Sequence, residues 1–313
     1  MSSDQLLDEA KAFDDRVFER VQNGLVPDLQ NAAKVDWFFN NPWRRPEYID
    51  MVFGDYLRFA CQYLSIPSTV LEIGSGLGHM SLELARKGHR VTGLELSPVS
   101  VKIATAYLNK CERGSTFGNL QFVNADFMQW EAPGKFDAIC CFLTLHHFAD
   151  PLQVIEKISG FLKPLGKIFV IEPARDLFSK RNASLVALIR LLLSINGNWH
   201  ENLSLPTDTQ SLDDLCNTIL QEYREAKDKN EKEQSPNDNS SYASTILEGL
   251  NKYFDQQDLT YGNTISPRLL GGVRAPRESE AIRIATFIKL FDEYATSQGI
   301  IEPGVFYYAG KLK

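Results

Sequence analysis

A glycine-rich turn constrains this chain more than any other segment. An apolar run that begins at Val70 carries the acid Glu72 and passes into Gly74, Gly76 and Gly78, after which the pattern becomes helical. Because glycine lacks a Cβ, a ligand can lie against the backbone of such a turn, and the free N–H groups of the helix favour a negative ligand group. The spacing is G-x-G-x-G, whereas dinucleotide-binding turns carry G-x-G-x-x-G. The segment therefore predicts a strand, a turn and a helix that bind a ligand other than a dinucleotide, unless the turn is purely structural.

Two further apolar runs end on acids. Glu95 follows Gly74 by 21 residues, close to the roughly 20-residue interval at which an acid meets ribose hydroxyls in nucleotide-binding βαβ units. Its two carboxylate oxygens can accept hydrogen bonds from both the 2′- and 3′-hydroxyls. The run 120–126 closes on Asp126 in the same way. The plainer alternative for such an acid is a solvent-facing position at the end of a strand.

Two later segments extend the pattern. The first, 135–151, is an apolar strand followed by Thr-Leu-His-His-Phe, and the second, 160–173, reads as a helix end, a turn and a fifth strand. Taken in order, these segments resemble the motifs of the class I S-adenosylmethionine-dependent methyltransferases. The resemblance covers about 68–173, roughly a third of the chain.

The resemblance implies that the chain binds S-adenosylmethionine and releases S-adenosylhomocysteine. It places the acid before the turn near the cofactor's amino group, the glycine loop around its methionine part, and the acid after the third strand beside the adenine amino group. Aromatic faces can hold the sulfonium by cation–π attraction. The expected cofactor-binding residues are Glu72, Gly74, Gly76, Gly78, Glu95, Asp126, Phe127 and Phe142.

The order of elements predicts an α/β fold. Strands are expected at about 69–73, 90–94, 120–124, 136–142 and 167–172, with helical patterns between them. Such alternation requires a parallel sheet with helices on both faces. The resemblance implies a doubly wound, Rossmann-like, seven-stranded and mostly parallel sheet, with the order 3-2-1-4-5-7-6 and an antiparallel last strand.

We divide the chain into four parts. Residues 1–66 form an N-terminal helical lid, and 67–175 form the cofactor-binding core. Residues 176–260 form a mainly helical insertion or substrate cap after strand 5; its segment 225–241 has almost no apolar residue and predicts a mobile loop. Residues 261–313 complete the sheet, with the sixth strand and its turn within 261–273.

The chemistry expected from the resemblance is an in-line displacement at the methyl carbon. Orientation of the two reactants supplies much of the acceleration, and no metal site is expected. A hydroxyl acceptor would need a base, whereas an amine or a carboxylate would not. His147 is the first candidate and His146 the second, because the loop after strand four lies at the carboxyl edge of the sheet, where ligands bind in open α/β folds. Either histidine could instead bond backbone groups or pack under the cofactor.

Residues for the acceptor come from three segments. They are an aromatic- and arginine-rich loop, the end of strand five and the insertion, and the candidates are Trp37, Trp43, Arg44, Tyr48, Glu172 and His200. Arginines near the loop and late in the chain could bind a carboxylate or phosphate through paired N–H donors: Arg44, Arg45, Arg268, Arg274 and Arg277. The alternatives are that the aromatics pack helices on the core, that Glu172 caps a turn, and that the arginines and His200 are solvated.

Charge and composition argue against a nucleic-acid-binding, disulfide-bonded or membrane-spanning protein. With 40 acidic and 33 basic side chains the net charge is −7, which argues against nucleic acid as substrate. The five cysteines include no C-x-x-C pair and predict reduced thiols. The first residues have no basic region followed by an apolar stretch, and the most apolar window, 183–195, is short of a membrane span. We therefore expect a cytoplasmic protein without a membrane or nucleic-acid partner, and the sequence leaves room for a homodimer.

The sequence supports methylation of a small molecule, with oxygen as the first choice because of His147. The alternatives are nitrogen or carbon methylation, or a cofactor-binding scaffold without catalysis. Aminopropyl transferases share the core but usually carry an acid-rich motif where this chain has Leu-His-His-Phe.

Overall fold

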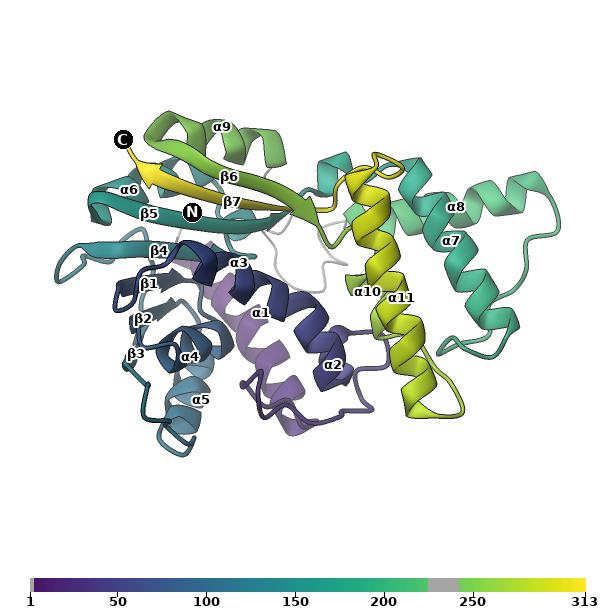
Figure 1. The fold of residues 1–313 in the computed structure, drawn as a ribbon, viewed down its shortest axis with the longest axis horizontal. Coiled ribbons are helices and arrows are strands. Elements are labelled where there is room, and N and C mark those ends of the chain that lie inside the picture. Colours follow the sequence, from purple (N-terminus) through teal and green to yellow (C-terminus); the bar gives the residue numbers. More distant parts are fainter. Residues whose placement is uncertain (1–2, 225–241) are drawn as a thin grey trace.

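Seven strands form one sheet in the computed structural model, which describes residues 3–224 and 242–313 (Figure 1). The strands are β1 (Thr69–Ile73), β2 (Arg90–Glu95), β3 (Asn119–Asn124), β4 (Phe136–Phe142), β5 (Leu162–Pro173), β6 (Phe254–Gly262) and β7 (Val305–Leu312). Their order is β3-β2-β1-β4-β5-β7-β6, and β7 runs antiparallel to both of its neighbours. The predicted α/β fold and strand order are therefore confirmed. The loop predicted at 225–241 lies outside the described residues.

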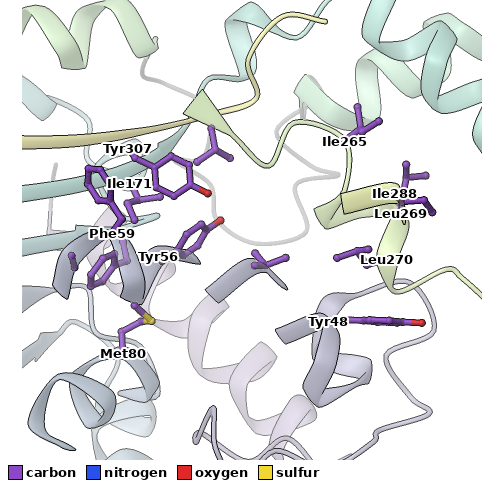
Figure 2. Close-up of a cluster of buried hydrophobic side chains, with 14 of the residues drawn as sticks. Tyr48, Tyr56, Phe59, Met80, Ile171, Ile265, Leu269, Leu270, Ile288 and Tyr307 are labelled. Carbon is purple, nitrogen blue, oxygen red and sulfur yellow. The ribbon is translucent and has the colours of Figure 1, made fainter. Parts of the chain in front are cut away.

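Each central strand buries both of its faces. Successive side chains on a strand point to opposite sides, so Cys140 joins one buried cluster and Cys141 the other. The first cluster is covered by α3 (Asp55–Tyr63), α4 (His79–Arg86) and α5 (Pro98–Leu108), and Figure 2 shows Tyr56, Phe59 and Met80 of this cluster near Ile171 and Tyr307 of the sheet. The second is covered by α6 (Pro151–Phe161) and α9 (Ala243–Tyr253). This two-sided burial explains the near-continuous apolar runs in the sequence.

The helices that follow β2 and β4 begin at residues that fix their first turn. Ser97 and Asp150 each accept backbone N–H bonds from the start of a helix, and each is followed by proline. Such side chains stabilise a helix start, and proline at the first position lacks an N–H that would need a partner. Ser97 lies two residues after the end of β2 and Asp150 ends the loop that follows β4, so both caps position loops at the carboxyl edge of the sheet.

The N-terminal segment lies over one end of the core. It comprises α1 (Ser3–Gln22), the 3₁₀ helix η1 (Pro42–Arg44), α2 (Pro46–Ile49) and a π-helical turn (Asp50–Gly54) that leads into α3. The helix α1 packs against α5. Between α1 and η1, the buried Asp28 binds Arg86 of α4 through two contacts of 2.7 Å and accepts a hydrogen bond from Tyr107 of α5 at 2.7 Å. Contacts of α1 with α5, and of Asp28 with α4 and α5, therefore hold the N-terminal segment against the core helices.

The chain after β5 is mainly helical. Following η4 (Arg175–Leu177), the helices α7 (Lys180–Ile195) and α8 (Thr209–Arg224) pack against each other. Figure 1 shows this pair away from the sheet, with α11 (Glu278–Ser297) between it and the N-terminal helices. The short α10 (Pro267–Leu270) packs against α11 and η1.

The predicted position of the sixth strand was wrong. We expected it within 261–273, but β6 spans Phe254–Gly262, and the later residues form a turn and α10. The strand lies at the edge of the sheet and most of its side chains are exposed, so it has no apolar run to reveal it. The expected domain boundary at 260/261 consequently falls inside this strand.

Candidate functional site

A cavity of about 460 Å³ lies at the carboxyl ends of the strands. Its wall includes the ends of β1 and β2, the loops after β3 and β4, side chains of α1, and Trp43 of η1. This volume is within the range of about 300–1,000 Å³ that is typical of small-molecule sites. Of the predicted site residues, the wall contains Trp43, Gly74, Gly76, Glu95, Asp126, Phe127 and His147.

The glycine loop contacts both the end of β2 and the loop after β4. The Gly74 N–H donates to the carbonyl of Leu94 at 2.8 Å, which ties the loop to the end of β2. A Cβ at Gly74 would lie 2.5 Å from Cγ2 of Thr144, so only glycine permits this approach to the loop after β4. The third glycine has another role: a Cβ at Gly78 would lie 2.3 Å from the ring of Phe122, so Gly78 serves the packing of α4 rather than the cavity wall.

Glu95 is held in place by backbone donors. Its Oε1 accepts the N–H of Ser97 and its Oε2 accepts the N–H of Gly76, both at 2.8 Å. Burial raises the pKa of this carboxyl, whereas these backbone hydrogen bonds act in the opposite direction. An ionised carboxylate has about four acceptor sites, so each oxygen retains capacity for a further donor. The side chain is therefore a preorganised acceptor at the cavity.

The loop after β3 supplies an acid and an aromatic ring. Asp126 Oδ1 accepts the N–H of Met128 at 2.9 Å, which fixes a turn at the strand end. The ring of Phe127 meets that of Phe148 edge to face with centroids 6.4 Å apart, and all four residues line the cavity. This part of the wall presents apolar rings beside one carboxylate.

Glu72 is not part of the cavity wall, contrary to the expected row of three acids. It lies on the same strand face as Val70, and its Oε2 accepts a hydrogen bond from the Ser81 hydroxyl of α4. Burial raises the pKa of Glu72 to about 8. The rim of the cavity therefore carries two of the three predicted acids, Glu95 and Asp126.

The raised pKa of Glu72 predicts a pH-dependent stability. The folded chain keeps this proton up to about pH 8, whereas the unfolded chain loses it near the ordinary value of 4.5. The free energy of unfolding of the wild type should therefore fall as the pH rises through this interval, because the folded state binds more protons there. Glu72→Gln has no proton to lose, so its stability relative to wild type should increase from pH 5 to pH 8 and then level off. Urea denaturation at each pH measures the difference, and the exposed Glu47→Gln is the control; parallel pH curves for wild type and Glu72→Gln would contradict the expectation.

A buried carboxylate organises the loop after β4. Glu172 at the end of β5 is fully buried, and its Oε1 accepts the N–H groups of Thr144 and Leu145, both at 2.6 Å. Its Oε2 lies 2.6 Å from Nδ1 of His146. The loop continues as η3 (Leu145–His147), in which the ring of His147 lies 4.1 Å from that of His146 and 5.2 Å from that of Phe13.

The observed contacts of three residues differ from their predicted roles. Glu172 was a candidate for contact with the acceptor, but its carboxylate is bonded to the β4 loop and does not line the cavity. His146, a candidate base, is bonded to Glu172 and is likewise outside the wall, so His147 alone of the two faces the cavity. Phe142, a candidate for cofactor contact, belongs to the buried cluster under α3 and α4.

The residues predicted to contact the acceptor do not lie together in the structure. Trp43 lines the cavity, and its ring lies 5.1 Å from that of His79. Trp37 packs edge to face on Phe38 at 4.6 Å and joins the cluster that attaches the N-terminal segment, as its plainer alternative stated. Three others lie outside the cavity wall: Arg44, Tyr48 and His200.

The sequence did not identify three side chains that α1 contributes to the wall. These are Phe13, Val17 and Arg20. Phe13 and Val17 belong to the apolar stripe of α1, so that stripe was the available signal. Arg20 carried none, because a single arginine on an exposed-looking face is normally solvated. Burial, together with repulsion from Arg16, lowers the pKa of Arg20, and its guanidinium brings positive charge to the cavity.

The described residues contain neither a candidate metal-binding cluster nor a candidate membrane-spanning helix. Within 3–224 and 242–313, no group of three or more histidine, cysteine, aspartate or glutamate side chains is arranged to hold a metal ion. None of the helices in the described part of the chain combines the length and apolar character of a membrane span. All five cysteines are free thiols, as predicted.

Comparison with known proteins gives one family and several partial relatives. A family model described as "Methyltransferase domain" matches residues 44–216, more than half of the chain. A ubiquinone biosynthesis O-methyltransferase of Xanthomonas campestris pv. campestris (strain B100) is 32% identical over 134 residues, which are 43% of this chain and 54% of the relative. One of the same name from Pseudomonas paraeruginosa is 35% identical over 102 residues, 33% of this chain and 43% of the relative. The chain thus spans about half the length of the curated relatives it matches.

A solved structure resembles the chain more loosely. The N-methyltransferase NodS from Bradyrhizobium japonicum WM9, in complex with S-adenosyl-L-homocysteine, is 12% identical, with 91% of this chain and 94% of that chain covered. The TM-score is 0.45, so this likeness has no bearing on the activity.

Proposed function

Because the chain belongs to the methyltransferase domain family, we propose that it transfers a methyl group from S-adenosylmethionine to a small-molecule acceptor. The observation that carries this proposal is the cavity, whose wall unites the glycine loop, Glu95, Asp126 and His147. In doubly wound folds, ligands bind at this edge of the sheet.

The residues of the wall fit the parts of the cofactor. The preorganised carboxylate of Glu95 would accept the ribose hydroxyls, and Asp126 would accept the adenine amino group while Phe127 covers the ring. The backbone at Gly74 and Gly76 would lie against the methionine part. Arg20 offers a cation for the cofactor's carboxylate, a charge-assisted contact of the kind that arginine makes best.

When bound, the cofactor supplies a methyl group on a positively charged sulfur. The task of the chain is to orient the acceptor and to exclude water, and α1 covers the cavity with Phe13 and Val17. His147 is a wall residue that can accept a proton from an acceptor hydroxyl as the new bond forms. Its position is set by the Glu172 and His146 contacts beneath the loop.

We take oxygen as the atom methylated. The His147 position supports it, and the curated relatives are named as O-methyltransferases. Nitrogen or carbon methylation and a cofactor-binding scaffold remain the alternatives. The expectation of a small-molecule acceptor without a nucleic-acid or membrane partner stays a prediction. The possible homodimer and the cytoplasmic location also stay predictions.

The proposal is tested by binding and then by transfer. Calorimetry with S-adenosylmethionine and S-adenosylhomocysteine should show one site per chain. A labelled-methyl screen against metabolite extract should then give a labelled small molecule. Binding without transfer would favour the scaffold, and no binding would refute the proposal.

Replacing His147 distinguishes a base from a packing residue. With the acceptor found in the screen, His147→Gln should lower kcat by about 100-fold, as is typical for loss of a general base. The affinity for S-adenosylhomocysteine should stay within a few-fold of wild type, because the glycine loop and Glu95 are unchanged. His146→Gln is the comparison, since it shares the loop but does not line the cavity. A full rate in His147→Gln would indicate an acceptor that needs no base.

A further inference from the structure

Three segments far apart in the sequence meet beside η1. They are the loop at 36–45, the turn after α7 at 198–200 and the turn after α10 at 271–274. The backbone N–H of Arg274 donates to the carbonyl of Asn198 at 2.7 Å, and its Nη2 donates to the carbonyl of Phe39 at 2.8 Å. A Cβ at Gly271 would lie 2.0 Å from the backbone nitrogen of Asn41, so the turn at 271–274 is in direct contact with the loop at 36–45.

We call the polar side chains at this meeting point the arginine junction: Arg44, Arg45, Tyr48, Trp199 and Arg274. Four of them are more than nine-tenths buried, with exposed fractions of 7% for Arg44, 6% for Arg45, 0% for Tyr48 and 5% for Trp199. Figure 2 shows Tyr48 on the side of its cluster where Leu270 of α10 lies, apart from Tyr56 and Tyr307. The guanidinium of Arg45 lies 5.9 Å from the centre of the Tyr48 ring.

The buried members carry donors without partners among the described residues. These are Nε and Nη1 of Arg44, Nε of Arg45, the hydroxyl of Tyr48 and Nε1 of Trp199. Guanidinium and indole groups can only donate hydrogen bonds. A buried donor that is left unpaired costs free energy, and a charged one costs more. The loop that carries Arg44 and Arg45 also buries one acceptor without a partner, Oδ1 of Asn40, so the unpaired donors here outnumber the unpaired acceptors.

The charge at the junction is also unbalanced. Arg44 reaches Asp36 at 3.3 Å and Arg45 reaches Glu278 at 3.0 Å, but these carboxylates are 76% and 58% exposed and are screened by solvent. Burial, followed by repulsion from Arg44, lowers the pKa of Arg274 to about 10. Despite burial, the bond to Glu278 raises the pKa of Arg45. Burial and the neighbouring arginines instead lower the pKa of Arg44 and of Arg274. The uncompensated positive charge therefore lies on Arg44 and Arg274.

We propose that the arginine junction binds a small oxyanion, the carboxylate or phosphate group of a small-molecule ligand. The unpaired N–H donors of Arg44 and Arg45 match the oxygens of such a group, and the Tyr48 hydroxyl, whose ring lies beside the Arg45 guanidinium, can donate to it as well. This site goes beyond the proposed methyl transfer, because none of its five residues lines the cavity, although Trp43 of the wall directly precedes Arg44.

Calorimetry on the full-length chain tests the proposal. Inorganic phosphate and succinate are titrated separately at constant ionic strength, with sodium chloride as the blank. Saturable binding of one or both supports the site, and the tighter of the two identifies the class of ligand. Absence of saturable heat for both, up to about 10 mM, would overturn it.

Tyr48→Phe is the decisive variant, because it removes only the buried hydroxyl and preserves the packing of the ring. It should weaken oxyanion binding by roughly tenfold, as expected for loss of a hydrogen bond to a charged group. Arg44→Gln should abolish binding. Arg277→Gln removes a mostly exposed arginine that is paired with Glu280, and it should have no effect. Unchanged affinity in Tyr48→Phe, or an equal loss in Arg277→Gln, would refute the assignment.

A titration of the same samples with S-adenosylhomocysteine separates the two proposals. If S-adenosylhomocysteine binds and the oxyanions do not, the arginine junction fails and the proposed methyl transfer stands. If oxyanions bind with the expected variant profile but S-adenosylhomocysteine does not, the junction stands and the proposed methyl transfer fails.

Discussion

Glu95→Ala is expected to bind S-adenosylhomocysteine roughly 100- to 10,000-fold more weakly than wild type. Two ribose hydroxyls would each lose a hydrogen bond to a charged acceptor, and such bonds contribute about 1.5–3 kcal/mol each. Each 1.4 kcal/mol corresponds to about a factor of ten in affinity. The effect should be this large because the carboxylate is already fixed by the N–H groups of Ser97 and Gly76, so no ordering is needed on binding. Calorimetry measures it directly.

The same substitution also removes the acceptor for those two backbone donors, and a ligand-side control separates the effects. Adenosine and 2′,3′-dideoxyadenosine are titrated into wild type and Glu95→Ala. If Glu95 acts through the ribose hydroxyls, the substitution should weaken adenosine binding but change dideoxyadenosine binding little. Equal losses for both nucleosides would mean that the glycine loop had moved, and the ribose role would be refuted.

The sequence predicted the central strands well for a physical reason. Strands buried on both faces must be apolar along their whole length, and β1, β2 and β4 lie in the middle of the sheet. Glu95 and Asp126 were found because acids that end such runs stand out against apolar neighbours. The order of the strands did not follow from the runs themselves; it came from the resemblance of the motifs.

The features that the sequence did not predict depend on how the elements pack against one another. The exposed edge strand β6 has no periodic apolar signal, so it was placed too late in the chain. Glu72 lies two residues before Gly74, where a ligand-binding acid was expected. Because side chains alternate along the strand, Glu72 instead faces α4 and accepts a hydrogen bond from Ser81. Arg20 enters the cavity only because α1 folds over it. The spacing of residue types along the chain does not specify how these elements pack.

The loop after β4 shows how a buried charge can act on a site that it does not touch. Glu172 is expected to be a positioning residue whose removal damages both stability and binding. Glu172→Ala leaves the N–H groups of Thr144 and Leu145 and the ring of His146 without their partner. Breaking a buried polar pair of this kind costs about 3–5 kcal/mol in the free energy of unfolding, which urea denaturation measures. Because Thr144 also contacts the glycine loop at Gly74, the affinity for S-adenosylhomocysteine should fall as well.

Glu172→Gln is the matched variant that tests this explanation. Its amide oxygen can still accept the two backbone N–H groups, and its amide nitrogen can donate to Nδ1 of His146 if the imidazole takes the other tautomer. It should therefore keep most of the stability and of the affinity that Glu172→Ala loses. Equal destabilisation by the two substitutions would show that the negative charge matters more than the bonds to Thr144 and Leu145. The loop would then be held mainly by the electrostatic contact between the Glu172 carboxylate and His146.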